Sequence, residues 1–227
     1  MSTTAVELRG LVRRFGERTA LQGLTVSLPA GATLAVLGRN GAGKSTLLRI
    51  LATLLRPHGG EAAVLGESLP RRAFAVRARI GYIGHDPLLY RDLSARENLR
   101  YHAQLRGVSP VRIEGLLEAV GMRGRGDEPV RSLSAGMVQR LAVCRGVLHD
   151  PELLLLDEPR ANLDPGASRL VEDMIGRPAG VTRVLTSHDP LEALAEADLV
   201  LGLRDGRVEF AGRADDVDPE RVEELYL

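Results

Sequence analysis

The chain has 227 residues, of which 44% are hydrophobic and 3% aromatic, so we expect one large α/β domain with an aliphatic core. Its 30 basic and 30 acidic residues give a formal net charge of zero, which argues against a nucleic-acid partner. No apolar run approaches the roughly eighteen residues of a membrane-spanning helix, and Met1-Ser2-Thr3-Thr4 begins no signal peptide. We therefore expect a cytoplasmic protein that meets a membrane only through a partner.

The first part of the chain predicts three strands. Val6–Arg14 and Leu24–Leu28 are strand candidates, and Pro29-Ala30-Gly31 forms a turn into a third, Thr33–Leu37. Phe15 lies between the first two strands beside a glycine, where it is either a core aromatic or a loop residue that stacks on a base. The local residues favour neither alternative.

A glycine-rich loop follows Thr33–Leu37 and precedes leucine and isoleucine at helical spacing up to Leu55. It fits the phosphate-loop pattern G-x-x-x-x-G-K-[ST]. Backbone N–H groups and a helix N-terminus bind triphosphate oxygens closely, and side chains at the glycine positions would block them. The predicted nucleotide-binding residues here are Gly38, Arg39, Asn40, Gly41, Ala42, Gly43, Lys44, Ser45 and Thr46.

Lys44 is the only lysine among the 30 basic residues. Arginine serves everywhere else, whereas the phosphate loop keeps the compact ammonium that a guanidinium cannot replace sterically. We expect Lys44 to bind the β- and γ-phosphates and the Ser45 hydroxyl to ligate Mg²⁺.

The middle of the chain interrupts the strands with helices. Glu61–Leu65 and Ile80–Ile83 are predicted strands, separated by the basic segment Arg71–Arg79, which could be helical. Ser94 and Glu97 have the spacing of a capping box and start a helix through Leu105, and Pro110 and Gly121 bracket another. These helices predict an inserted lobe from about Pro87 to Arg131.

Ser134 is the predicted N-cap of a helix that runs to about Leu148. This helix contains the lone cysteine, Cys144, whose apolar surroundings favour a small buried thiol over a reactive one. A single cysteine also excludes a disulfide or a cysteine-based metal site within one chain.

Four consecutive leucines, Leu153–Leu156, suit a buried parallel strand, although periodicity alone does not exclude a helix. Asp157 and Glu158 would then lie at its carboxyl end, where open α/β sheets bind ligands.

The last elements alternate helix and strand. Asp164-Pro165 starts a helix, and Val181–Ser187 is a strand with His188 at its end. The turn Asp205-Gly206 predicts a hairpin of Leu199–Leu203 and Arg207–Phe210, and Pro219–Leu227 reads as a terminal helix.

Each later feature is weak alone, because acidic pairs and lone histidines are common. Their order is more specific: a phosphate loop at Gly38, LSAG at Leu133, LLLLDE ending at Glu158, NLD at 162–164 and TSHD around His188. In this arrangement the chain resembles the ATP-binding-cassette (ABC) ATPases over essentially its whole length. The resemblance implies a P-loop NTPase fold of ABC type, with a mixed sheet core flanked by helices, a β subdomain and a helical lobe. We expect one domain, residues 1–227, with its core at 1–86 and 132–227 and its lobe at about 87–131.

The resemblance also implies roles for single residues. Asp157 would help hold Mg²⁺, Glu158 would polarise the attacking water, and His188 would contact the γ-phosphate and that water. Phe15 matches the aromatic that stacks on adenine, which favours stacking over the core alternative. ATP and Mg²⁺ are the implied cofactors.

A second set of residues implies a partner cassette. Ser134 and Gly136 match the signature that binds the γ-phosphate of ATP held by the other subunit, and Asp164 lies in the loop that crosses this interface. Two ATP molecules would be sandwiched between two head-to-tail cassettes, which we expect to form a homodimer. The lobe resembles the one that docks on integral membrane permease subunits, which would place the protein on the inner face of the cell membrane.

Several positions depart from the family pattern. Ala135 and Met137 replace the usual glycine and glutamine of the signature. His85 stands where a Mg²⁺-contacting glutamine is usual, and imidazole suits Mg²⁺ poorly compared with oxygen, so its assignment as a metal ligand is uncertain. Arg160 replaces a common threonine, and its simplest interpretation is a solvated charge.

Within the family, GYIGHDPL at 81–88, LSARENLRYHAQL at 93–105 and the LSAG variant most resemble the ATPase of the haem exporters of cytochrome c maturation. We expect no regulatory domain after the cassette, which would fit the same subgroup. Exporters for multidrug or antibiotic efflux share most of this pattern. The remaining alternatives are a non-transport ABC ATPase acting on ribosomes or DNA, and a regulatory cassette that closes on ATP without turnover.

Overall fold

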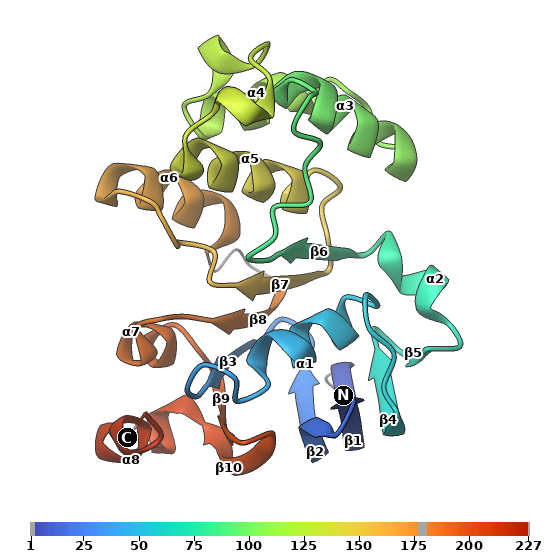
Figure 1. Cartoon of the computed structure of the whole chain (residues 1–227), viewed down its shortest axis with the longest axis vertical. Helices are drawn as coiled ribbons and strands as arrows, with labels where there is room; N and C mark the ends of the chain where they lie inside the picture. The colour runs from blue at the N-terminus through green and yellow to red at the C-terminus, as the bar shows by residue number, and fades with distance from the viewer. Residues whose placement is uncertain (1–2, 177–180, 227) are drawn as a thin grey trace.

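The computed structural model describes residues 3–176 and 181–226, whose strands form two sheets (Figure 1). The antiparallel sheet has the order β2-β1-β4-β5, formed by Arg18–Pro29, Thr4–Phe15, Gly59–Val64 and Glu67–Leu69. The larger sheet has the order β10-β9-β3-β8-β7-β6, formed by Arg207–Arg213, Leu199–Arg204, Thr33–Leu37, Thr182–Thr186, Leu153–Asp157 and Ile80–Ile83. Its neighbours pair in parallel except β10 with β9, which confirms the predicted mixed sheet.

Helices cover the larger sheet and extend beyond it. The α-helices are α1 (Lys44–Leu51), α2 (Ala73–Arg77), α3 (Ala95–Arg106), α4 (Arg112–Ala119), α5 (Ala135–Val147), α6 (Pro165–Ile175), α7 (Pro190–Ala195) and α8 (Pro219–Glu224). Short 3₁₀ turns occupy Arg123–Arg125, Val130–Ser132 and Ala214–Asp216. In Figure 1, α3 and α4 lie at one end of the molecule, beyond α5, and the antiparallel sheet lies toward the other. None of the helices in the described ranges has the length and apolar character that crossing a bilayer requires.

Several predicted boundaries differ from the structure. β1 and β2 each span 12 residues because hairpin pairing continues past the apolar pattern, so Phe15 is the last residue of β1. The helix after the phosphate loop ends at Leu51 rather than Leu55, since Thr53 adopts a left-handed conformation with φ of 61°. β5 was not predicted. The predicted end of the last helix, Leu227, lies outside the described residues, and α8 itself ends at Glu224.

The predicted helix starts rest on side-chain caps. Ser94 and Glu97 form both hydrogen bonds of a capping box at the start of α3. Ser134 accepts a hydrogen bond from the N–H of Met137 and caps α5. Asp164 caps α6 in the same way.

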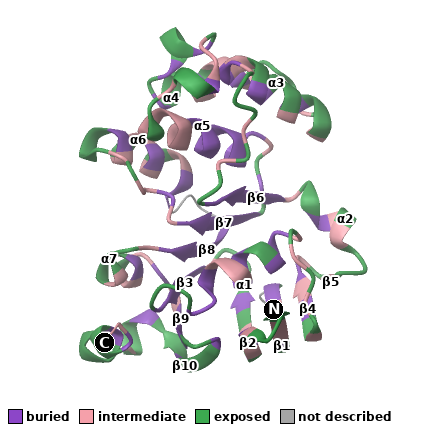
Figure 2. Cartoon of the chain, in the orientation of Figure 1, coloured by how far each residue is buried: buried purple, intermediate pink, exposed green. Residues whose placement is uncertain are grey.

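Buried apolar side chains form three clusters, which Figure 2 shows as purple segments of the sheet and of the inner helix faces. The first joins the antiparallel sheet to α1, and the second packs α6, α7 and α8 against the larger sheet. The third packs α3 and α4 on α5 and includes Cys144. Burial raises the pKa of the Cys144 thiol to about 12, which agrees with the predicted unreactive role.

Helix α5 approaches strand β6 closely enough to require glycine on both elements. A Cβ atom on Gly81 would lie 2.4 Å from the carbonyl oxygen of Gly146, and one on Gly146 would lie 2.6 Å from the Ile83 side chain. Gly115, on the exposed face of α4, has open space at the same position.

We expect Gly81→Ala to lower the free energy of unfolding by about 1–3 kcal/mol, because the added methyl group overpacks the contact with α5. Gly115→Ala is the matched control and should raise it by up to about 1 kcal/mol, since alanine favours an exposed helix. Urea denaturation followed by circular dichroism measures both variants. Equal effects of the two substitutions would show that the α5–β6 approach is not tight.

Candidate functional site

The functional residues gather where the parallel strands end. β8 lies between β3 and β7 in the sheet, so the phosphate loop after β3 and the acidic pair at the end of β7 are separated by one strand. With strand spacings near 4.8 Å, this leaves roughly 10 Å between the two strands. A gap of this size accommodates a phosphate group and a water molecule.

The phosphate loop needs its glycines for different reasons. Gly38, Gly41 and Gly43 have φ angles of 140°, 85° and 112°, in the region that side chains rarely adopt. A Cβ atom on Gly38 would also lie 2.2 Å from the carbonyl oxygen of Leu203. The loop conformation therefore depends on these glycines, as its sequence pattern predicts.

The Lys44 ammonium is held over the loop. Its Nζ donates hydrogen bonds to the carbonyl oxygens of Gly38 at 2.6 Å and Arg39 at 3.2 Å. Burial lowers the pKa of Lys44, while the carboxylates of Glu158 and Asp157 act to raise it. A single buried ammonium thus faces both carboxylates and the loop.

A cavity of about 350 Å³ lies over the phosphate loop and brings together most of the predicted nucleotide-binding residues. Its lining consists of Phe15, Arg18, Ala20, Asn40, Gly41, Gly43, Lys44, Ser45, Thr46, Arg49 and Glu158. The volume is typical of a small-molecule site.

Phe15 forms an apolar wall at the edge of this cavity. The residue is 46% exposed rather than part of the core, and the Arg13 guanidinium lies 4.5 Å from its ring centroid. Arg18, which sequence reasoning missed, donates a hydrogen bond to the carbonyl oxygen of Gly41 at 2.9 Å. No local sequence signal separates Arg18 from the other arginines.

Thr186, at the end of β8, organises the acidic pair. Its hydroxyl donates to Asp157 Oδ1 at 2.9 Å and accepts a hydrogen bond from the backbone N–H of Glu158 at 3.1 Å. Sequence reasoning missed Thr186, although a polar residue closing a buried apolar strand was a usable signal.

Glu158 and His188 form a pair at the rim. His188 Nε2 lies 2.6 Å from Glu158 Oε2, and the His188 side chain is 68% exposed. Glu158 adopts a left-handed conformation with φ of 56°, a strained geometry for a residue with a side chain. This turn directs the Glu158 carboxylate toward the cavity and its neighbour Asp157 into the interior.

The residues present fit a Mg²⁺ ion. Asp157 is buried, and its Oδ2 atom has no hydrogen-bond partner in the described part of the chain, which is costly for a carboxylate unless a cation is bound. Within residues 3–176 and 181–226, no group of three or more His, Cys, Asp and Glu side chains forms a metal cluster. Mg²⁺ suits this arrangement, because it takes one or two protein ligands together with phosphate oxygens and water.

The predicted signature residues do not line this cavity. Ser134 and Gly136 lie at the exposed start of α5, and a Cβ atom on Gly136 would be 3.1 Å from the carbonyl oxygen of Asn162. The start of α5 and the turn before α6, which contains Asn162 and Asp164, therefore form a second cluster. His85 is exposed in the loop after β6 and does not line this cavity either.

Arg160 differs from its expected role, and Tyr226 makes a contact that was not expected. Arg160 is not a solvated charge: its side chain is 21% exposed and pairs with carboxylates of α6 and α7. Tyr226, which the sequence did not mark, accepts a hydrogen bond from the backbone N–H of Gly38 at 3.1 Å. The end of the described chain thus contacts the first glycine of the phosphate loop.

Comparisons with known proteins agree with this geometry. Residues 21–161 match the family described as ABC transporter. The chain is 38% identical to the daunorubicin resistance ATP-binding protein DrrA3 of Streptomyces coeruleorubidus, over 97% of this chain and 72% of that one. It is 36% identical to a Nod factor export ATP-binding protein I of Ralstonia nicotianae, over 91% of this chain and 66% of that one.

Solved structures show the same fold. The structure of an ATP-binding subunit of an ABC transporter superposes with a TM-score of 0.87 at 27% identity, over 97% of this chain and 99% of that one. A dimeric ATP-binding cassette bound to ADP and phosphate superposes with a TM-score of 0.84 at 23% identity, over 92% of this chain and 98% of that one. The chain therefore belongs to the ABC transporter family, as one of its ATP-binding ATPase cassettes.

Proposed function

We propose that this cassette binds Mg²⁺-ATP in the cavity over the phosphate loop and uses its hydrolysis to drive export through separate membrane subunits. One observation carries the assignment of a working ATPase: the Glu158 carboxylate reaches into that cavity and lies 2.6 Å from His188. A regulatory cassette that closes on ATP without turnover would need no such pair.

Binding rests on groups that are already in place. The N–H groups of the phosphate loop and of the start of α1 meet the triphosphate oxygens, and Lys44 supplies a positive charge. The Phe15 ring presents an apolar surface for adenine at the rim. Bound Mg²⁺, held by Ser45 and Asp157, would neutralise charge on the phosphates.

Hydrolysis requires a water in line with the γ-phosphorus. Glu158 accepts a proton from this water as its oxygen bonds to phosphorus, and the bond from phosphorus to the β–γ bridging oxygen breaks to give ADP and phosphate. His188, hydrogen-bonded to Glu158, orients that carboxylate and contacts the γ-phosphate. General-base catalysis of this kind contributes on the order of 10²–10⁴ in rate.

The second cluster supports a two-cassette arrangement. Ser134 and Gly136 lie at the exposed start of a helix, which favours an anion, yet they are not part of their own chain's ATP cavity. In a head-to-tail homodimer they would cover the γ-phosphate bound by the partner, with Asp164 beside the interface. The solved dimeric cassette of the same fold supports this assembly.

The transported substrate is proposed from the relatives. Their names refer to daunorubicin resistance and to Nod factor export, which favours efflux of an antibiotic-like molecule through permease subunits at the membrane. The more specific prediction of haem export for cytochrome c maturation finds no support in these names.

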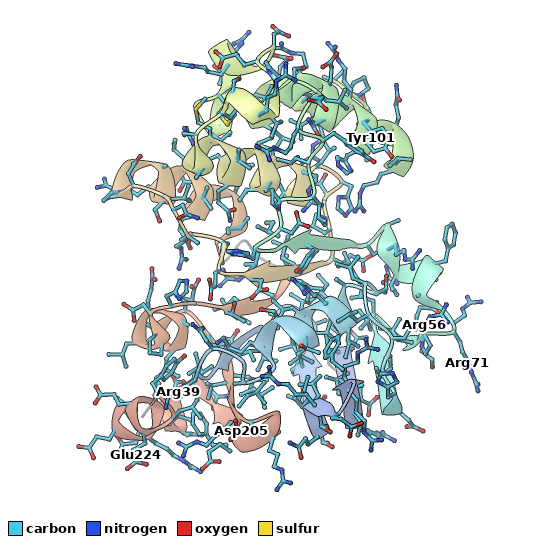
Figure 3. The ribbon with its side chains drawn as sticks, in the orientation of Figure 1. Arg39, Arg56, Arg71, Tyr101, Asp205 and Glu224 are labelled. Carbon is cyan, nitrogen blue, oxygen red and sulfur yellow. The ribbon has the colours of Figure 1, made fainter. Side chains whose placement is uncertain are left out.

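We expect Lys44→Ala to weaken ATP binding by about 10- to 100-fold, because a charge-assisted contact with the phosphates contributes about 1.5–3 kcal/mol. Isothermal titration calorimetry with ATP measures the affinity. Arg71→Ala is the control. Arg71 is exposed between β5 and α2, on the opposite side of the molecule from α7, the helix that follows His188 (Figure 3). If Lys44→Ala bound ATP with unchanged affinity, the assignment of the phosphate loop as the ATP-binding site would be wrong.

We expect Glu158→Gln to keep its ATP affinity and lose turnover by about 10²–10⁴-fold, because the amide cannot accept the proton. With ATP bound and not hydrolysed, the variant should accumulate as a dimer in size-exclusion chromatography. Wild-type turnover no greater than that of Glu158→Gln would defeat the catalytic assignment and favour the regulatory alternative.

Deletion of the gene separates the transport alternatives. We expect increased antibiotic susceptibility that the wild-type gene restores and the Lys44→Ala gene does not, because export requires ATP binding. Haem-stained cytochrome c in membranes of the same strains should be unchanged. Loss of covalent haem with unchanged susceptibility would replace efflux by haem export.

A further inference from the structure

Arg160 connects the turn that carries Glu158 to two helices. Its guanidinium contacts Glu172 of α6, with Nε 3.1 Å from Oε2. Its Nη1 atom lies 3.1 Å from Oε1 of Glu192 on α7 and 3.1 Å from Oε1 of Glu196, the C-cap residue of that helix. One side chain therefore holds three carboxylates in a site that is only partly open to water.

Helix α7 starts directly behind His188. Asp189 is its N-cap and accepts hydrogen bonds from the N–H groups of Leu191 and Glu192, each at 3.0 Å. Glu192 and the C-cap residue Glu196 are four residues apart, about one helical turn, and both reach Nη1 of Arg160. The link through Arg160 thus runs from the turn after Glu158 to the helix that follows His188.

The far end of this link is fixed in the sheet. Arg183 of β8 is 1% exposed, and its Nη1 atom lies 3.2 Å from Oε2 of Glu196. It also donates to Thr33 Oγ1 and to the carbonyl oxygen of Ile175, each at 3.1 Å. Glu196 is therefore shared by Arg160 and a buried arginine that cannot move without breaking sheet contacts.

Ionic side chains border an open space beside Glu158 and His188. A cavity of about 170 Å³ lies between the turn after Glu158 and the segment around His188. Glu158, Arg160, His188 and Glu196 all line it. Across this space the ion pairs of Arg160 join the turn after Glu158 to α7, in addition to the contacts of Glu158 itself with Thr186 and His188. The left-handed backbone at Glu158 adds strain that the surroundings must hold.

We propose that Arg160 is a positioning residue, which holds the Glu158 carboxylate against His188 by tying the turn after Glu158 to α7 through Glu192 and Glu196. The proposal rests on the proposed roles of Glu158 and His188 in hydrolysis. Arg160 itself does not line the cavity over the phosphate loop. Its removal should change the rate of the chemical step and leave nucleotide binding intact.

Steady-state ATPase kinetics of the full chain test this. Arg160→Met keeps the length of the side chain and should lower kcat about tenfold, because small misplacements of a catalytic group are costly, while KM for ATP changes less than about twofold. Arg160→Lys retains the charge without the planar fork and should recover part of kcat. Glu192→Gln should lower kcat in the same direction as Arg160→Met.

Glu172→Gln is the matched control. It weakens an ion pair of the same arginine, but to α6 rather than to the helix behind His188, so kcat should stay within about twofold of the wild type. Thermal unfolding by circular dichroism identifies variants that fail to fold. If Arg160→Met is one of them, Glu192→Gln tests the same link with a more exposed side chain.

Two outcomes would overturn the proposal: wild-type kcat in Arg160→Met, or an equal loss of kcat in Glu172→Gln and Arg160→Met. Glu158→Gln, measured alongside, separates a failure of the positioning role of Arg160 from a failure of the proposed function. If Glu158→Gln is inactive and Arg160→Met is normal, only the positioning role is lost. If Glu158→Gln hydrolyses ATP at the wild-type rate, the assignment of Glu158 itself is wrong.

Discussion

The site depends on balancing negative charge at one edge of a sheet. Asp157 and Glu158 lie beside the proposed triphosphate site, and carboxylates near phosphates repel them strongly in a partly buried site. Lys44, the backbone N–H groups of the phosphate loop and a divalent cation are the groups that can offset this repulsion. The buried position of the Lys44 ammonium, fixed by two loop carbonyl oxygens, places its charge between the loop and the acidic pair before any ligand arrives.

Strand β8 makes this balance compatible with catalysis. It separates β3 from β7, which leaves room for the proposed phosphate and water between the loop and Glu158. Its last residue, Thr186, contacts both acidic residues through one hydroxyl group. The same strand supplies Arg183 to the interior and leads to His188. The spacing of the phosphate site and the orientation of its acids are therefore set by a single element.

The sequence predicted what is local. Apolar runs, caps such as Ser94 and Ser134 and the glycine pattern of the phosphate loop are formed by neighbouring residues, and the structure confirms them. It could not predict contacts that join distant segments. The ion pairs of Arg160 unite three parts of the chain. The sequence marks Arg160 as a departure from the family pattern, but nothing near it indicates its carboxylate partners. The contact between Tyr226 and Gly38 was not predicted for the same reason, because it joins two distant segments.

A threonine at position 160 would need no ionic partner, whereas an arginine in this partly buried turn needs carboxylates to offset its desolvation. The structure supplies them from two helices, so the charge is satisfied only when α6 and α7 are both in place. On the other side of the turn, Gln139 of α5 donates a hydrogen bond to the carbonyl oxygen of Pro159 at 2.9 Å. The turn after Glu158 is thus held between the helix that begins at Ser134 and the helix that follows His188. Movement of either helix must displace the segment that carries the proposed base.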